Sequence, residues 1–284
     1  MKFKTCLINS LAAFSRPGWR ASLVHAFCLA VLRIVRPRIN VARENLGSVF
    51  PDATDSWIRD TVNGVYSHLS WMVAEYLALQ RDPRLALNWM RAVEGKEILD
   101  ELKASGSGAI ILTGHLGNWE LLAAWLAQSG YPLSAVVRNP DDSEVAALIA
   151  SYRTKAGVGF FEKQHVMKEA VRFARKGGFL GLLIDQAWNI SGVPTTFLGR
   201  PCYTASGPAA IAKLAGVPVV PVASYRVAPF KHQVFISDPI TMNEDTAGKE
   251  EYIKKNTEIM NKTVEKMILN RPEQWLWLHR RWRY

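Results

Sequence analysis

Apolar residues recur every three or four positions over residues 56–80, the spacing that places them on one face of an α-helix. Asp55 or Ser56 is suited to cap the start of this helix, and Pro83 marks the end of a helical N-terminal part. A second strongly amphipathic helix is expected over 249–269. Helices of this kind bury one face against a core and leave the other in water.

From about residue 90 the pattern changes to short apolar runs that alternate with helical stretches. The expected strands cover 108–113, 133–137, 179–184, 218–225 and 233–237, and the expected helices begin near Gly117 and cover 143–155, 166–176 and 206–215. Strands and helices that alternate with short connections predict an α/β fold. We expect a central, mostly parallel sheet flanked by helices.

The N-terminal 40 residues contain an apolar run over 21–32 that is too short to cross a bilayer, since it has twelve residues and a spanning helix needs about 20. Arginines flank this run on both sides, at Arg16, Arg20, Arg33, Arg36 and Arg38. Two readings stay open: a helix that lies in an anionic membrane surface, or a core helix of a soluble domain. No small-x-small site follows the earlier stretch 6–14, so we expect no cleaved signal peptide.

Composition narrows the choice of partner. Lys and Arg total 35 against 25 Asp and Glu, a net charge of +10, and ten tryptophans accompany this excess. A basic, Trp-rich chain suits either nucleic acid or an anionic membrane surface. We expect no nucleic-acid binding, because no RNP, KH or zinc-finger pattern is present and the arginines cluster only at the two ends. Cys6, Cys28 and Cys202 form neither a disulfide framework nor a zinc site, which suggests a reducing compartment.

The candidate chemistry lies in the stretch 113–122, Thr-Gly-His-Leu-Gly-Asn-Trp-Glu-Leu-Leu, which follows a buried strand. Ligand sites in open α/β sheets lie at this carboxyl edge. Four residues separate His115 from Glu120, so the carboxylate can reach one imidazole nitrogen across the first helical turn. A His held in this way is suited to act as a general base toward a hydroxyl. Taken alone, the pattern is more typical of a helix cap with a satisfied His and a surface Glu.

H-x4-D/E after a buried strand resembles the glycerolipid acyltransferase superfamily, and this sequence resembles its lipid A late acyltransferase branch. The resemblance rests on several further blocks in matching order, among them Arg43-Glu-Asn-Leu, Asp185-Gln186, Phe197-Leu-Gly-Arg200, Thr204-Ala-Ser-Gly-Pro208, 216–221 and the Trp-rich stretch 272–282. It implies a glycerol-3-phosphate acyltransferase-like fold with an N-terminal helical membrane-associating segment. The expected division is a membrane-associating segment 1–40 and an acyltransferase domain 41–284, with a helical preface 41–90 and an α/β core 91–284.

The resemblance also implies roles for individual residues. His115 would remove the proton from the acceptor hydroxyl, Glu120 would orient His115, and Arg153 and Asp185 would complete the catalytic set. Arg138 and Arg172 are alternatives for the arginine. Asn118 would be an extra donor, and Gly199 and Arg200 would bind an anionic headgroup. We expect no metal and no cofactor.

The resemblance implies an acyl donor, either acyl carrier protein or acyl-CoA, and a lipid A precursor or another glycolipid as acceptor. It places the protein on the cytoplasmic face of the bacterial inner membrane, attached peripherally, monotopically or by a single N-terminal anchor. The short apolar run favours monotopic attachment. The alternatives are an acyltransferase for a different glycolipid or phospholipid, such as a mannosyl phosphoinositide, and a membrane-associated thioesterase that activates water with the same residues. Trp275, Trp277 and Trp282 are expected to serve partly at the membrane interface and partly in the core.

Overall fold

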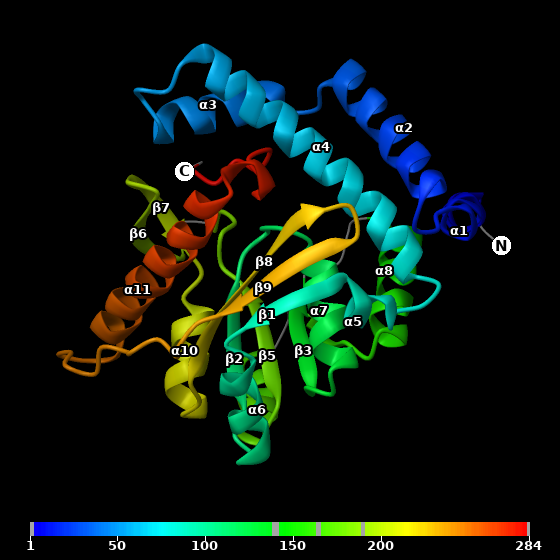
Figure 1. Cartoon of the computed structure of the whole chain (residues 1–284). Helices are drawn as coiled ribbons and strands as arrows, with labels where there is room; N and C mark the ends of the chain where they lie inside the picture. The colour runs from blue at the N-terminus through cyan, green and yellow to red at the C-terminus, as the bar shows by residue number, and fades with distance from the viewer. Residues whose placement is uncertain (1–2, 138–141, 163–165, 189–190, 283–284) are drawn as a thin grey trace.

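A single seven-stranded sheet organises the protein (Figure 1). The computed structural model describes residues 3–137, 142–162, 166–188 and 191–282. The strands lie in the order β1-β9-β8-β2-β5-β3-β4, with bounds β1 Met90–Glu94, β2 Ala109–Thr113, β3 Leu133–Val137, β4 Gly159–Glu162, β5 Phe179–Leu183, β8 Val219–Ala228 and β9 Lys231–Ile236. All neighbouring pairs are parallel except β8 with β9. The predicted α/β fold with a mostly parallel sheet is confirmed.

Helices cover both faces of this sheet, which explains why its central strand β2 is buried along its whole length and is apolar up to Thr113. In β2, Ile110 and Leu112 pack into one hydrophobic cluster, while Ala109 and Ile111 pack into the other. The first cluster includes residues of α9 (Val166–Arg175), α10 (Gly207–Ala215) and α11 (Lys249–Asn270). The second includes residues of α5 (Leu85–Trp89), α6 (Lys96–Ala104) and α7 (Trp119–Gln128). Helix α8 (Ser143–Lys155) packs against β4 and α1.

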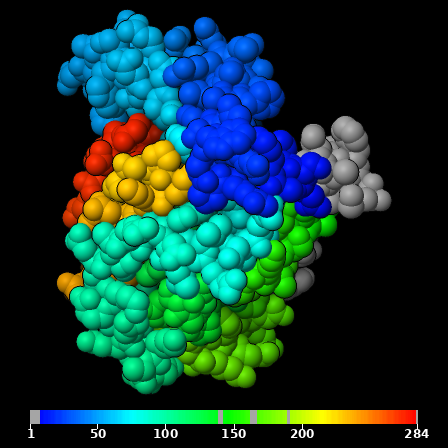
Figure 2. All heavy atoms as spheres, turned by 45° about the vertical axis from the view of Figure 1, so that its right-hand side comes forward, coloured from blue at the N-terminus to red at the C-terminus, as the bar shows by residue number. Residues whose placement is uncertain are grey.

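A layer of N-terminal helices lies at one end of this α/β body (Figure 2). It consists of α1 (Phe3–Phe14), α2 (Trp19–Val35), α3 (Ile39–Val49) and the long α4 (Asp55–Leu79). The predicted helix 56–80 is thus confirmed, but the cap prediction is wrong: Thr54 accepts the Trp57 backbone N–H at 3.2 Å. Small buried residues join the layer, with Ala12, Ala21 and Val24 packed against Ala74 and Leu77 of α4. The predicted division at residue 40 stays a prediction.

Helix α2 packs one face against α4 and the core and leaves its other face exposed, so both predictions for 21–32 stay open. Only Ala21 and Val24 of α2 are buried. Its large apolar side chains are exposed instead at positions three or four apart: Trp19 66%, Leu23 52%, Phe27 68%, Val31 40%, Ile34 81% and Val35 66%. Among the described helices, none combines the length and apolar content needed to cross a membrane.

Two further features were not expected from the sequence. The strands β1 and β4 close the two edges of the sheet, and β6 (Val193–Phe197) pairs with β7 (Arg200–Thr204) in a separate antiparallel hairpin. These strands are four or five residues long and lack a clean alternation, so the sequence carries little signal for them. In the hairpin, Pro194 and Pro201 further weaken that signal.

Candidate active site

The register of the sheet brings His115 and Asp185 together. Strands β2 and β5 are parallel neighbours, and Thr113 at the end of one pairs with Leu183 at the end of the other. His115 and Asp185 each follow two residues later, so they leave the same carboxyl edge side by side. No spacing in the sequence shows this, because 70 residues separate the two.

Asp185 holds His115 through two hydrogen bonds. Its Oδ1 accepts from His115 Nδ1 at 2.9 Å, and its Oδ2 accepts from the His115 backbone N–H at 2.8 Å. The Trp275 indole N–H donates to the same Oδ2 at 2.7 Å. Burial would raise the pKa of Asp185, but the neighbouring His115 and these hydrogen bonds lower it to about 2. A charged acceptor at Nδ1 therefore fixes both the orientation and the tautomer of the ring.

The other ring nitrogen of His115 contacts Gln186. Because Nδ1 carries the proton that it donates to Asp185, Nε2 keeps a lone pair, and the Gln186 amide N–H donates to it at 3.2 Å. The His115 side chain is 20% exposed, whereas that of Asp185 is 1% exposed. Trp119 packs edge-on against the imidazole, with ring centroids 5.1 Å apart. The arrangement is a partly exposed base whose Nε2 lone pair is occupied by one amide N–H.

Glu120 does not take the position that the sequence predicted for it. Its carboxylate forms an ion pair with Arg153 of α8: Arg153 Nε donates to Oε2 at 3.2 Å, and Arg153 Nη2 donates to Oε1. Burial would lower the pKa of Arg153, but the hydrogen bond and the charge of Glu120 raise it. The prediction that Glu120 orients His115 is therefore contradicted: the structure pairs His115 with Asp185 and Glu120 with Arg153. Of the two alternatives to Arg153 for the catalytic arginine, Arg138 lies outside the described residues, and Arg172 lies in α9.

Asn118 is the N-cap of α7 and is fully buried. Its Oδ1 accepts the Leu121 backbone N–H at 3.0 Å, and its Nδ2 donates to Glu75 Oε2 at 2.9 Å. Both ends of the amide are thus used inside the protein. This geometry does not support the prediction that Asn118 donates to substrate.

Gly199 and Arg200 lie at the tip of the β6–β7 hairpin. Leu198 and Gly199 both have positive φ, at 48° and 76°, as a tight two-residue hairpin turn requires. The Arg200 guanidinium lies 5.4 Å from the centre of the Trp282 ring, and Trp282 in turn contacts Trp275 with centroids 6.2 Å apart. Aromatic rings therefore link the hairpin tip to the indole that bonds Asp185, and the predicted role in headgroup binding stays a prediction.

The C-terminal tryptophans are mainly core residues. Trp275 is 2% exposed and Trp277 is 0% exposed, so for these two the predicted core role is confirmed and the predicted interfacial role is wrong. The same segment holds the His115 turn from outside: the Gly117 N–H donates to Gln274 O at 3.0 Å, and the Leu276 N–H donates to His115 O at 3.2 Å.

Comparison with known proteins identifies the family of this chain. A family profile described as bacterial lipid A biosynthesis acyltransferase matches residues 6–284. The chain belongs to this family. The predicted family and the prediction of an acyltransferase are thereby confirmed at the level of the family.

Individual relatives of this acyltransferase family are distant. The chain is 24% identical over 261 residues to the lipid A biosynthesis lauroyltransferase of Escherichia coli, covering 89% of this chain and 81% of that protein. It is 26% and 25% identical to phosphatidylinositol mannoside acyltransferases from two strains of Mycobacterium tuberculosis, over 145 and 158 residues. These matches cover 49% and 53% of this chain, and the chain spans 45% and 49% of the two mycobacterial proteins, about half their length.

The sequence did not predict two residues that form hydrogen bonds with Asp185 and His115. Trp275 and Gln186 were noted only as parts of longer blocks, yet they contact Asp185 and His115 directly. An indole or amide in such a block is typical of many loops, so its chemistry appears only when the three segments meet.

Proposed function

We propose that this protein moves a fatty acyl chain from an acyl thioester, on acyl carrier protein or coenzyme A, to a hydroxyl of a lipid A precursor or a similar anionic glycolipid. The main supporting observation is the His115 ring: a buried carboxylate accepts from Nδ1, and the lone pair of Nε2 is occupied only by the Gln186 amide N–H. This is the geometry of a general base for a hydroxyl nucleophile. His115 is the proposed base, and Asp185 is its proposed partner.

The proposed reaction begins when the acceptor hydroxyl takes the place of the Gln186 amide at His115 Nε2. Nε2 removes the hydroxyl proton while the oxygen attacks the thioester carbonyl, and Asp185 stabilises the imidazolium that forms. The tetrahedral intermediate collapses with loss of the thiolate. The imidazolium returns its proton to that sulfur, so ester and thiol are the products and the base is restored.

Glu120 and Arg153 remain proposed members of the catalytic set, but as an ion pair with each other and not with Glu120 orienting His115. Their ion pair lies next to Trp119, whose ring contacts His115. Arg153 can stabilise negative charge near the site only through the N–H groups that Glu120 leaves free. Removal of Glu120 is therefore expected to act through Arg153 rather than through the His115 tautomer.

The acceptor class is supported by the family and by its relatives. The E. coli relative is named for lipid A and the mycobacterial relatives for phosphatidylinositol mannoside. Both names describe anionic glycolipids, which suit the net charge of +10. A lipid A precursor is our first choice, because the E. coli alignment covers most of both chains. A mannosyl phosphoinositide-type acceptor is the second, and thioester hydrolysis by the same base is the third.

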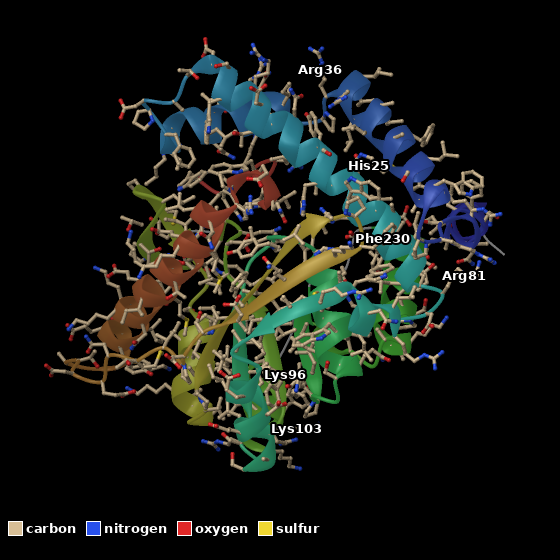
Figure 3. All side chains as sticks on the ribbon, in the orientation of Figure 1. His25, Arg36, Arg81, Lys96, Lys103 and Phe230 are labelled. Atoms are coloured by element: carbon tan, nitrogen blue, oxygen red, sulfur yellow. The ribbon has the colours of Figure 1, made fainter. Side chains whose placement is uncertain are left out.

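The exposed apolar residues of α2 form a stripe that supports attachment to a membrane surface, namely Trp19, Leu23, Phe27, Val31, Ile34 and Val35. We propose that this surface is the cytoplasmic face of the bacterial inner membrane, as the family resemblance implies. Residues 1–43 contain eight Lys and Arg and no Asp or Glu, and the basic residues are Lys2, Lys4, Arg16, Arg20, Arg33, Arg36, Arg38 and Arg43. Arg36 points away from the protein body at the end of α2 (Figure 3). An apolar stripe bordered by cations suits a helix lying in an anionic bilayer surface. We propose monotopic attachment through this stripe.

Expression in a bacterium that lacks its own late acyltransferases tests the reaction. Mass spectrometry of the lipids is expected to show one added acyl group, and its mass and position identify donor chain and acceptor. A His115→Ala strain must lack this product. Release of free fatty acid from acyl carrier protein at the same rate with and without acceptor would favour the hydrolase instead.

Sedimentation with vesicles tests the attachment. The double substitution Phe27→Glu and Ile34→Glu changes side chains that are 68% and 81% exposed, so the fold is expected to persist. We expect binding to phosphatidylglycerol vesicles to weaken at least about 100-fold, because each apolar side chain contributes about 1.5–3 kcal/mol on burial. Leu214→Glu, at a 47% exposed position of α10 at the other end of the molecule, is the matched control. Unchanged sedimentation of the double variant would rule out the stripe as the contact.

A further inference from the structure

A buried ion pair between Glu75 and Arg226 lies next to the turn that carries His115. Arg226 of β8 donates to Glu75 of α4 through both Nε and Nη2, at 2.9 and 2.7 Å, and the two side chains are 7% and 0% exposed. Glu75 Oε1 also bonds His232 Nε2 at 3.0 Å and accepts the Phe230 backbone N–H at 3.3 Å. Phe230 lies at the turn between β8 and β9, beneath α4 (Figure 3).

The neighbouring groups determine the protonation state and tautomer of His68, a second buried residue of α4 in this cluster. Burial, and then the charge of Arg226, lower the pKa of His68 to about 3, so its ring is neutral. Arg226 Nη1 can only donate, so His68 Nδ1 accepts from it. The remaining ring N–H, at Nε2, therefore donates to the Gly117 carbonyl at 3.1 Å.

Two of these contacts end on the turn that carries His115. His68 bonds the carbonyl of Gly117, and Glu75 accepts the side-chain amide of Asn118 at 2.9 Å. The turn has little room to adjust, because Gly117 has φ +58° and a Cβ there would lie 1.8 Å from the Ser224 carbonyl oxygen. Strand β8, helix α4 and the C-terminal segment thus enclose the turn that presents the base.

From this geometry we propose that Glu75, Arg226 and His68 are positioning residues. They hold the 115–118 turn so that His115 Nδ1 bonds Asp185 while Nε2 is oriented toward the acceptor hydroxyl. None of the three touches His115 in the structure. A buried ion pair is a poor source of stability, since burial of the charges offsets most of their attraction, whereas it fixes geometry well. The inference rests on the proposed acyl transfer for its kinetic consequence only.

Two double variants separate positioning from simple support of the fold. Glu75→Gln with Arg226→Met removes both charges but keeps an oxygen for the Asn118 amide. Glu75→Leu with Arg226→Met removes the charges and that oxygen together. We expect the Leu-containing variant to lose kcat at least about 10-fold with KM for donor and acceptor changed less than about 3-fold, and the Gln-containing variant to recover most of the loss.

Hydrogen exchange gives a readout that needs no activity. Peptides spanning 113–122 are expected to exchange faster in the Leu-containing variant than in the Gln-containing one, with peptides of α10 unchanged. Leu99→Ala, a fully buried position in α6, is the control for general destabilisation, and its kcat per folded molecule should stay at the wild-type value. If the Leu-containing protein does not fold, His68→Leu against His68→Gln makes the same comparison at the Gly117 carbonyl.

Equal kcat and equal exchange in the two double variants, or in the two His68 variants, would overturn the proposal. An inactive wild-type protein would refute the proposed acyl transfer instead, and the exchange comparison would still decide whether the cluster holds the turn.

Discussion

Substitution Asp185→Asn tests the candidate site most directly, because it keeps size and shape while it changes one acceptor into a donor. Asp185 Oδ2 accepts two N–H groups, from the His115 backbone and the Trp275 indole, so the asparagine oxygen is expected to take this position. The amide NH2 then faces His115 Nδ1, which must accept, and the ring proton moves to Nε2. The lone pair needed to receive the hydroxyl proton is lost.

The expected cost follows from the tautomer. The corresponding change in a serine protease triad lowers kcat about 10⁴-fold, and here we expect about 10³- to 10⁴-fold, or about 4–5 kcal/mol. Two of the three hydrogen bonds keep their direction and the third is reversed, so the melting temperature should fall by no more than about 10 °C.

The assay measures kcat and KM with an acyl thioester donor and lipid acceptor in mixed micelles, with product quantified by mass spectrometry. Glu120→Gln is the comparison, since that residue pairs with Arg153 rather than His115. We expect its kcat to fall less than that of Asp185→Asn. A kcat within about 10-fold of wild type for Asp185→Asn, or a larger loss for Glu120→Gln, would refute the pairing deduced from the geometry.

Three further outcomes are expected. Gly117→Ala should prevent correct folding or unfold several degrees lower in a thermal melt, because the added Cβ would overlap the Ser224 carbonyl at 1.8 Å; a normal melting temperature would contradict this. Gln186→Ala should free the lone pair of His115 Nε2, so that labelling of His115 by diethyl pyrocarbonate accelerates about 2- to 10-fold, as the loss of one hydrogen bond predicts. An unchanged labelling rate would show that the Gln186 amide does not bond this nitrogen. Asp185 has its pKa lowered from 3.8 to about 2, so its carboxylate contributes roughly 2 kcal/mol of stability above pH 4 that is lost as the pH falls toward 2. Denaturant titrations should therefore show the stability gap between wild type and Asp185→Asn narrowing below pH 4, and a constant gap would contradict the shift.

Much of the fold could be predicted because local pattern and tertiary environment agree. Residues 133–137 and 143–155 form β3 and α8 with the predicted bounds, and 249–269 forms α11 within one residue. The central strand β2 was recognisable because burial on both faces leaves a continuous apolar run. The hairpin β6–β7 was not, since its pairing depends on a turn and a partner strand rather than on hydrophobic period.

The sequence also predicted only part of the candidate site. The H-x4-E stretch at the end of a strand was enough to locate His115 at the carboxyl edge of the sheet. It was not enough to assign the partner, because Glu120 is near in sequence whereas Asp185 is near in space through the β2–β5 register. Trp275 and Gln186 reach the site from two further segments, so a single stretch of sequence could not predict them.

By itself, the sequence determined the alternating α/β layers, the family and the position of the base, since each depends on short-range pattern or on motifs in order. Only the tertiary structure decided which carboxylate holds His115, that Trp275 and Trp277 are core, and that α2 turns its apolar residues outward. The physical reason is that hydrogen bonds and burial depend on which segments meet. That depends on strand register and helix packing, which the order of residues within one segment does not show.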